Sequence, residues 1–504
     1  MSRSSNIPSA EGSYCTLGNL EVRRLPVALE SDDSKVITRR FLPDANRIKG
    51  LFSRIEQMSD VLVQEVLATV ESDYGHRHKN LEKTFENNWQ EGCNQAGIGA
   101  NWSPARRLLG GAYLTMEYAV ESAALFNPSI VPHPDQSGVA PGSRRFLMSL
   151  RATGEGHISS VVFRTGIIDA GNNIKLDPPS EQHRRTHIDP DRQYLKPTFC
   201  RKLGEMGVHS WIVDTLMERL GETFGLDELE AAAANADEQV VGHAEFKADL
   251  ETIVWLARSN YEIKLDKEAP ISELVVFPMS EADARGIEDL RLVQFVDDDG
   301  SVEYYGTYTA YNGMHTLPMM VSTESFHNLH FSSLNGACSA NKGMALFPRK
   351  IDGHYVMCAR IDGEHLYIMY SDYVHFWETA ERIDFPRSPW EMYQLGNCGS
   401  PIETPEGWLL LTHGVGPVRT YSIGAILLDL ENPRKVIGRL RQPLIMSSGD
   451  EREGYVPNVV YTCGAMINNG ELIIPYAVAD TSVRMAAVDI QHLVTRLLAG
   501  GPDL

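Results

Sequence analysis

The sequence lacks the segments that would place the protein in a membrane or in a disulfide-linked scaffold. No window reaches 18 uninterrupted apolar residues, which excludes a membrane-spanning helix. The seven cysteines are scattered, and no two form a C-x-x-C pair, which argues against a disulfide framework and a zinc site. The polar N-terminus has no apolar stretch of the kind a secretory signal needs. We therefore expect a cytoplasmic protein without a bound metal.

Basic residues are in short supply. The 46 Lys and Arg residues face 67 Asp and Glu residues, a formal net charge of −21. Such a surface repels nucleic acid and anionic lipid, so neither is an expected partner. An anionic substrate would need a local cationic pocket set against this overall field.

Familiar catalytic motifs are absent as well. The chain has no G-x-G-x-x-G after a strand, no Walker loop, no G-x-S-x-G elbow and no H-E-x-x-H. We expect no cofactor. What remains is a set of polar residues at strand ends, where a rigid scaffold can aim side chains into a pocket.

Three stretches of the C-terminal half share one plan. They cover residues 341–377, 396–429 and 456–489. Each gives a short apolar strand, a hairpin dipeptide and a returning strand, and the dipeptides are Asp352-Gly353, Glu406-Gly407 and Asn469-Gly470. The repeat is a little longer than a typical propeller blade. A β-propeller is therefore favoured over a β-sandwich with coincidental turns, and its strand ends would gather around one axis.

The rest of the chain suggests where this domain begins. Apolar residues recur at helical spacing in 46–92, and Pro104 opens a second helix that we expect to run to about Phe126. Strand patterns follow, interrupted by a helical stretch at 195–262. Adding 127–170 and 283–335 to the three repeats gives five blades. We predict an all-β five-bladed β-propeller at 126–504 with a helical insertion, and an N-terminal arm and helical extension at 1–125.

Four donor or cationic residues stand at comparable places in the repeats. Lys342 opens one repeat and Arg360 ends its second strand, while His413 and Tyr421 flank the hairpin of the next. Lys and Arg at inner strand ends would focus positive potential, and Arg can form two bonds to an oxyanion. Taken alone, each basic residue is more often a surface or rim salt bridge, and His413 a structural histidine; the case rests on their shared position within the repeats.

Carboxylates are the second need of sugar chemistry, because cleaving a glycosidic bond requires protonation of a poor leaving group. Asp480 sits at a strand end and Glu155 between two early strands, and either also suits an ordinary turn. Tyr311 is one of several aromatic residues that suit stacking on a sugar ring, although aromatics in β-repeats are more often core.

Several long strings resemble glycoside hydrolase family 130. They include NKGMALFPRKIDGHYVM, GNCGSPIETPEGWLLLTHGV, YVPNVVYTCGA and YTAYNG, and the resemblance covers roughly residues 103–495. It implies a five-bladed propeller and an inverting reaction in which phosphate attacks a terminal β-mannosyl unit to give α-mannose 1-phosphate. The long form with a helical extension resembles the β-1,2-oligomannan phosphorylase branch.

The resemblance also implies roles for particular residues. Phosphate would be bound by Lys342, Arg360, His413 and Tyr421, whereas family hydrolases carry carboxylates in place of the last two. Sugar binding carries over to Arg151 and Asp480, with Asn127 and Tyr311 added as candidates. Phosphate is already a nucleophile and needs cationic positioning rather than a base, which fits this set.

One position departs from the family pattern. The string T-Y-T-A-Y-D-G holds the family's acid, and this chain has Asn312 in place of that Asp. An amide cannot donate a proton as an acid does. Glu155 or Asp480 would then supply the proton, or the alignment of this residue misleads, or the protein binds sugar without turnover.

The sequence thus predicts a phosphorylase of β-mannosides whose partners are an oligosaccharide and phosphate. An inverting β-mannosidase and a non-catalytic carbohydrate-binding propeller remain the alternatives. Helices outside the propeller make a homodimer an additional expectation.

Overall fold

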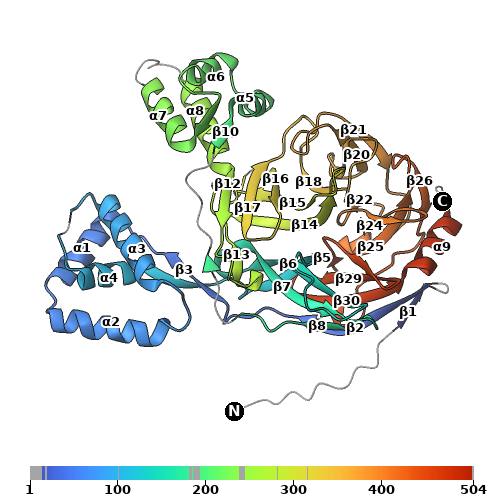
Figure 1. Cartoon of the computed structure of the whole chain (residues 1–504), viewed down its shortest axis with the longest axis horizontal. Coiled ribbons are helices and arrows are strands. Elements are labelled where there is room, and N and C mark those ends of the chain that lie inside the picture. Colours follow the sequence, from blue (N-terminus) through green and yellow to red (C-terminus); the bar gives the residue numbers. More distant parts are fainter. Residues whose placement is uncertain are drawn as a thin grey trace, which may run out of the picture.

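The computed structural model describes residues 14–17, 20–99, 101–180, 184–185, 193–237, 244–280, 282–314 and 316–501. Figure 1 shows a body of β-sheets from which two helical parts stand out, α1–α4 and α5–α8. Within the described ranges no helix combines the length and apolarity needed to span a bilayer.

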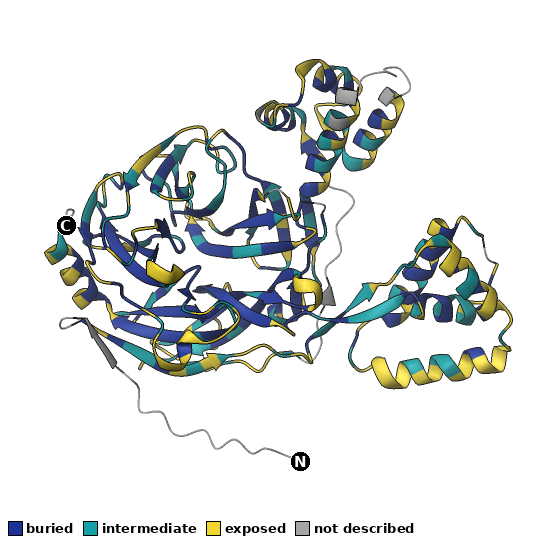
Figure 2. Cartoon of the chain, turned by 180° about the vertical axis from the view of Figure 1, so that it is seen from behind, coloured by how far each residue is buried: buried dark blue, intermediate teal, exposed yellow. Residues whose placement is uncertain are grey.

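Four helices precede most of the body. They are α1 (Ala45–Glu56), α2 (Asp60–Tyr74), α3 (Leu81–Ala96) and α4 (Pro104–Ala112). The Asp44 side chain caps α1, and Ser59 caps α2. The helices pack around a shared apolar cluster that includes Phe52 and Trp89. α2 buries only Val63 and is exposed along most of its length (Figure 2).

The prediction of one helix from Pro104 to about Phe126 is wrong in its second half. α4 ends at Ala112, and the chain continues as β4 (Thr115–Ala119), which pairs with β3 (Val36–Arg40). A Cβ on Gly111 would lie 1.8 Å from the Phe85 carbonyl oxygen, so this glycine lets α4 approach α3 closely. β4 is only partly buried, but the run ends in β5 (Ala124–Pro132), which is buried on both faces. Such a strand has the same apolar composition as a buried helix.

Five groups of antiparallel strands form the body. The first holds β5 (Ala124–Pro132), β6 (Arg144–Thr153), β7 (Ser159–Ile168) and β8 (Ile174–Leu176). The second holds β14 (Gly286–Val296), β15 (Val302–Tyr311), β16 (Thr316–Thr323) and β17 (Asn328–Ser333). The third holds β18 (Lys342–Leu346), β19 (Tyr355–Arg360), β20 (Leu366–Ser371) and β21 (Ala380–Asp384).

The two remaining groups lie nearer the C-terminus. The fourth holds β22 (Gln394–Asn397), β23 (Ile402–Thr404), β24 (Gly407–Val415), β25 (Tyr421–Leu428) and β26 (Val436–Arg439). The fifth holds β27 (Val460–Tyr461), β28 (Met466–Asn468), β29 (Glu471–Val478) and β30 (Ser482–Asp489). A pairing of Gly286 with Ser159 joins the first group to the second. The groups follow one another around the body in chain order (Figure 1).

Two of the three hairpin dipeptides lie in turns as predicted, and the third is shifted by one residue, because Gly407 already begins β24. Asp352 and Gly353 both have positive φ, at 51° and 77°, and so do Asn469 and Gly470, at 43° and 78°. Positive φ at both central residues matches the twist of the flanking strands. Glu406 lies in the turn between β23 and β24, where Thr404 pairs with Gly407.

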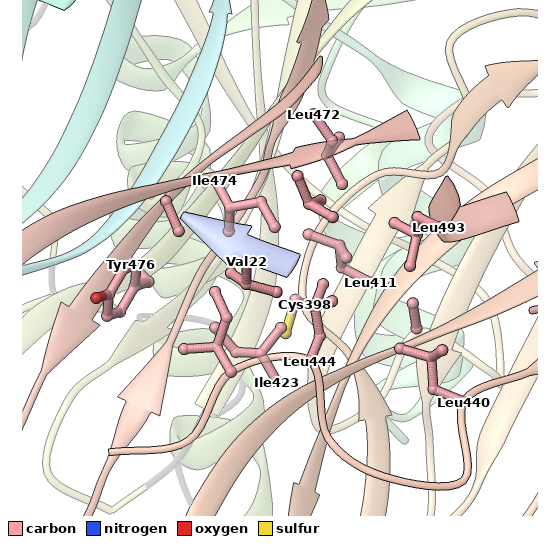
Figure 3. Packing of buried hydrophobic residues seen from close by; sticks show 14 of the residues in the cluster. Val22, Cys398, Leu411, Ile423, Leu440, Leu444, Leu472, Ile474, Tyr476 and Leu493 are labelled. Carbon is pink, nitrogen blue, oxygen red and sulfur yellow. The ribbon is translucent and has the colours of Figure 1, made fainter. Parts of the chain in front are cut away.

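The N-terminal segment completes the last group. β2 (Leu20–Leu29) pairs with β30, and β1 (Tyr14–Leu17) pairs with β2. Val22 of β2 lies among Ile474, Tyr476 and Leu472 in a buried cluster (Figure 3). α9 (Ile490–Gly500) covers this cluster with Leu493. Part of the segment expected to be an extended arm is therefore a core strand.

Helices occupy most of the stretch predicted to be helical at 195–262. They are α5 (Lys196–Glu205), α6 (Ser210–Met217), α7 (Leu226–Asp237) and α8 (Ala244–Ser259), with β10 (Gln193–Leu195) paired to β11 (Thr223–Gly225). The chain returns to the body as β12 (Tyr261–Lys264), on β17, and β13 (Leu274–Val276), which pairs with β7 and with β9 (Arg184–Arg185). Lys202 Nζ donates to the Leu334 carbonyl at 2.9 Å, which ties α5 to the body.

Candidate active site

One cavity of about 270 Å³ gathers polar residues from all five strand groups. Its lining residues are Asn127, Arg151, Glu288, Asp289, Lys342, Arg360, His413, Arg419, Tyr421, Val456, Val459, Tyr461 and Asp480. Seven of them were predicted from the sequence: Asn127, Arg151, Lys342, Arg360, His413, Tyr421 and Asp480. Segments more than 300 residues apart therefore meet at one site.

A repeated irregularity of the strands aims several of these side chains. The register shifts within β5, β14 and β18, and in each shift one residue has positive φ: Asn127 at 48°, Asp289 at 55° and Gly343 at 89°. Asp480 follows β29 with φ of 50°. Bulges re-aim side chains, and left-handed backbone at non-glycine residues concentrates at functional sites. The structure thus places strained backbone where the cavity lies.

The cavity carries positive charge against the field of the whole chain. Arg151, Lys342, Arg360 and Arg419 line it together with three carboxylates, Glu288, Asp289 and Asp480. The protein as a whole has 21 more acidic than basic residues. Four cations against three carboxylates leave the lining with a formal charge of +1, and an anion requires such a cationic pocket.

Glu288 and Asp289 are held by basic neighbours. Arg151 contacts Glu288 at 3.2 Å and Asp289 at 3.4 Å, and Lys342 Nζ contacts Glu288 at 2.5 Å. The Asn127 amide donates to Asp289 at 2.6 Å. Burial alone would raise the pKa of Asp289, but Arg151 and Arg291 outweigh it and the pKa is lowered. Asp289 is therefore ionised at neutral pH.

Asp480 behaves in the opposite way. Its burial and the negative charge of Asp289 raise its pKa to about 6, and Arg151 and Arg419 only partly offset this. Two neighbouring carboxyls thus have pKa values pushed apart. Such a pair suits acid–base work, because one member keeps its proton closer to neutral pH.

Arg360 and His413 form a pair across two strand groups. Arg360 Nη1 lies 3.0 Å from His413 Nε2, and Gln394 Nε2 lies 2.9 Å from the same nitrogen. Arginine can only donate, so His413 Nε2 accepts and the ring is neutral. Burial and the charge of Arg360 lower the pKa of His413 well below its usual value. The Tyr421 ring lies parallel to the imidazole at 6.1 Å.

Behind these residues a buried arginine connects both halves of the cavity. Arg291 donates to the Tyr461 hydroxyl at 2.8 Å and to the carbonyls of Asp289 and Cys398. Tyr461 in turn packs edge-on against His413 at 5.1 Å. Arg291 therefore fixes the backbone of the carboxylate side and the ring on the cationic side.

Glu155, Tyr311 and Asn312 do not line this cavity. Glu155 is exposed in a short turn, and its carbonyl accepts from the Tyr118 hydroxyl. Tyr311 donates to the Gly313 carbonyl, and the Asn312 side chain accepts from the Met314 amide. Thr309 of β15 pairs with Glu288, which lines the cavity. Asn312 follows Thr309 by three residues, just past the end of β15, so it lies roughly 10 Å further on.

The sequence interpretation missed four polar lining residues: Glu288, Asp289, Arg419 and Tyr461. A signal for the first two was present. Asn127, Asp289 and Gly343 occupy the same place at the start of three strand groups, in the strings FNPS, IEDL and NKGM. Aligning the starts of the groups, rather than the hairpins, would have brought Glu288 and Asp289 beside Lys342.

Within the described ranges, no group of three or more His, Cys, Asp and Glu residues suits a metal ion. The cavity's own donors are guanidinium, ammonium, hydroxyl and carboxyl groups, which suit an anion and a polyol.

The chain is similar in sequence to known mannoside phosphorylases. Residues 240–498 match the family model of glycoside hydrolase family 130, described as β-1,4-mannooligosaccharide phosphorylase. A 1,2-β-oligomannan phosphorylase of Thermoanaerobacter sp. (strain X514) is 34% identical over 46% of this chain and 75% of its own length. A β-1,2-mannobiose phosphorylase of the same organism is 35% identical over 46% of this chain and 73% of its own.

Among solved structures, a β-1,2-mannobiose phosphorylase from Listeria innocua is 22% identical, with a TM-score of 0.45, over 76% of this chain and 93% of its own. Asn127 and Arg151 precede the segment that the family model matches, and the other eleven residues lining the cavity fall inside it. The chain belongs to glycoside hydrolase family 130.

Proposed function

We propose that the cavity is the active site of an inverting phosphorylase that removes terminal β-mannosyl units from oligomannosides. The contacts of the Arg360 guanidinium carry this proposal. Its guanidinium contacts the neutral His413 imidazole and, among the described residues, has no carboxylate within ion-pair distance. No neighbouring carboxylate therefore neutralises its positive charge, which is left to bind an anionic co-substrate. The named relatives that share the family are phosphorylases, which supports the same reading.

In the proposed reaction a phosphate oxygen attacks the anomeric carbon from the face opposite the leaving group. The bond from that carbon to the glycosidic oxygen breaks, and the product is α-mannose 1-phosphate. Arg360, Lys342 and Tyr421 hold the phosphate, and His413 acts by orienting Arg360. Phosphate needs no base, because at neutral pH it already carries the electron pair and charge for attack.

The leaving oxygen needs a proton, and we assign it to the Asp289–Asp480 pair. Of the two, Asp480 is the one that holds a proton below about pH 6, because its pKa is raised to about 6 while that of Asp289 is lowered. Asp289, ionised and bonded to Asn127, binds a sugar hydroxyl, and its charge raises the pKa of Asp480. Asn312 has no part in this step, so the replacement of the family's Asp there gives little support to a non-catalytic binder.

We propose a β-1,2-linked substrate, because the two relatives named above act on β-1,2-oligomannan and β-1,2-mannobiose. The test incubates the enzyme with β-1,2-mannobiose or β-1,4-mannobiose, each with and without inorganic phosphate. Formation of α-mannose 1-phosphate from the β-1,2 disaccharide, dependent on phosphate, is expected. Equal release of free mannose without phosphate would instead identify a mannosidase, and binding without release would identify a carbohydrate-binding protein.

We also propose that the five strand groups are the blades of a five-bladed β-propeller. Five antiparallel groups in chain order, each sending residues from its strand ends into one cavity, support it. In this arrangement 126–504 forms the catalytic domain, with α5–α8 inserted in it. Residues 1–125 add the helical extension α1–α4 and the strand β2, which is built into the last blade.

No disulfide joins Cys200, Cys338, Cys358, Cys398 and Cys463, which fits the proposed reducing cytoplasm. The homodimer stays a prediction.

A further inference from the structure

A pair of stacked rings stands at the rim of the cavity. The rings of His157 and Tyr455 have centroids 5.7 Å apart and planes 24° apart, and the Tyr455 hydroxyl lies 3.4 Å from His157 Nδ1. Both residues are exposed, and Tyr455 keeps 63% of its surface in water. Large aromatic surface left in solvent beside a binding cavity is a mark of a ligand contact.

The Tyr455 side of the pair is joined directly to the cavity wall. The next residue, Val456, lines the cavity, and neighbouring Cα atoms are about 3.8 Å apart. The Tyr455 amide donates to the Thr481 hydroxyl at 2.9 Å, and the Val456 amide donates to the Ala479 carbonyl at 2.8 Å. These two acceptors flank Asp480, whose carboxyl lies in the cavity.

The His157 side is held in a strained turn at the end of β6, the strand that carries Arg151. His157 has φ of 58°, a left-handed conformation that is strained at a non-glycine residue. A Cβ on Gly154 would lie 2.2 Å from the Ala119 carbonyl oxygen, so the turn packs closely on β4. Tyr118 of β4 donates to the Glu155 carbonyl at 2.9 Å. The strand that leaves the helical extension thus supports this rim.

The cavity is too small to enclose a whole oligosaccharide. Its volume, about 270 Å³, is below the ~300–1,000 Å³ of pockets that enclose a drug-sized ligand. A phosphate and a mannosyl ring would fill most of it, so further sugar units must lie outside, over the rim. Large aromatic residues inside the strand groups do not provide this surface, because Tyr308, Trp377 and Trp408 are at most 2% exposed.

We propose that His157 and Tyr455 form an outer subsite that stacks on a sugar ring of the acceptor chain and gives the enzyme a preference for longer oligomannosides. This rests on the proposed phosphorylase function. A pyranose ring presents an apolar face of C–H groups, which packs on an aromatic ring while its hydroxyls stay in water. The exposed Tyr455 ring offers an aromatic surface for that face.

The test uses the synthetic direction, with α-mannose 1-phosphate as donor and mannose, β-1,2-mannobiose or β-1,2-mannotriose as acceptor. Tyr455→Ala should lower kcat/KM for the longest acceptor by about three- to tenfold, as for the loss of one ring contact. It should leave kcat/KM for mannose as acceptor and the KM for α-mannose 1-phosphate unchanged. His157→Ala should act in the same direction, and Tyr455→Phe should retain the preference.

Tyr373→Ala is the matched control, because Tyr373 is 68% exposed and does not line the cavity. It should behave as the wild type with every acceptor. If the His157–Tyr455 contact merely fixes the two loops, Tyr455→Ala will affect mannose and the longer acceptors equally, which overturns the proposal. An unchanged preference for length also overturns it.

Failure of the phosphorylase proposal looks different, because the wild type would then release no phosphate with any acceptor. In that case calorimetric binding of β-1,2-mannotetraose decides the subsite. Weaker binding by Tyr455→Ala than by Tyr373→Ala supports it, and equal binding refutes it.

Discussion

Arg360 Nη1 and His413 Nε2 lie 3.0 Å apart, although the two residues belong to different strand groups. Gly396 makes room for this contact, because a Cβ there would lie 2.6 Å from His413 Cε1 and 3.1 Å from Arg360 Cδ. The imidazole is neutral and accepts, so it positions the guanidinium without competing with it for an anion. The histidine of the proposed active site therefore supports phosphate binding through the arginine.

Replacing His413 by Phe should therefore weaken phosphate binding selectively. The ring and its packing against Tyr421 and Tyr461 remain, while the acceptor for Arg360 is lost. We expect the KM for phosphate to rise by about tenfold, the cost of about 1–2 kcal/mol for one charge-assisted hydrogen bond. The KM for the mannoside should stay within about twofold. Equal changes in both constants would show that His413 has only a structural role.

Replacing Asp289 by Asn distinguishes the role of Asp289 from that of Asp480. The negative charge of Asp289 helps to raise the pKa of Asp480, so its removal should lower that pKa. A proton donor must be protonated, and activity falls as the pH rises through its pKa. The alkaline limb of the pH–kcat profile should therefore move to lower pH in Asp289→Asn, with residual activity below pH 6. Complete loss of activity at every pH would make Asp289 itself the donor.

Asp480→Asn should be inactive and yet more stable at neutral pH. A carboxyl whose pKa rises on folding, here to about 6, costs stability above that pH and none below its unfolded value of ~3.9. Removing it should raise the free energy of unfolding by about 1–3 kcal/mol at pH 7–8. The gain should shrink as the pH falls from 6 to 4. Urea unfolding at several pH values measures this, and a loss of stability at pH 8 would contradict it.

Asn312→Asp tests whether the departure from the family string matters. Asn312 does not line the cavity, and its side chain accepts from the Met314 amide. We expect kcat to stay within about twofold, since an ionised carboxylate can accept the same bond. A large rise in kcat would place the proton donor at this position and displace the Asp289–Asp480 pair.

Part of this site could be predicted from the sequence because its residues belong to recognisable repeats. Lys342 begins β18 and pairs with Arg360, which ends β19. The hairpin between them carries Asp352-Gly353, a dipeptide that predicts the positive φ values found there. His413, near the end of β24, and Tyr421, at the start of β25, occupy comparable strand ends in the next group.

Glu288 and Asp289 were missed because the resemblance signal of their group lies at its other end, in TYTAYNG. The position of Asp289 depends on a shift of strand register, and single-residue patterns do not reveal such a shift. The helix assigned up to Phe126 failed for a different reason: an apolar run has the same composition in a buried helix and in a strand covered on both faces. Neither contact of Arg291, with Tyr461 or with Cys398, has a local signature, because the residues are more than 100 positions apart.

The most direct test of the central claim is the reverse reaction. The enzyme is incubated with α-mannose 1-phosphate or β-mannose 1-phosphate and with β-1,2-mannobiose, and released phosphate and chain length are followed together. An inverting phosphorylase should release phosphate from the α anomer alone, with one new β-1,2-mannosyl unit for each phosphate. Use of the β anomer, or no reaction with either donor while mannose is released from mannobiose in phosphate-free buffer, would contradict inverting phosphorolysis at this site.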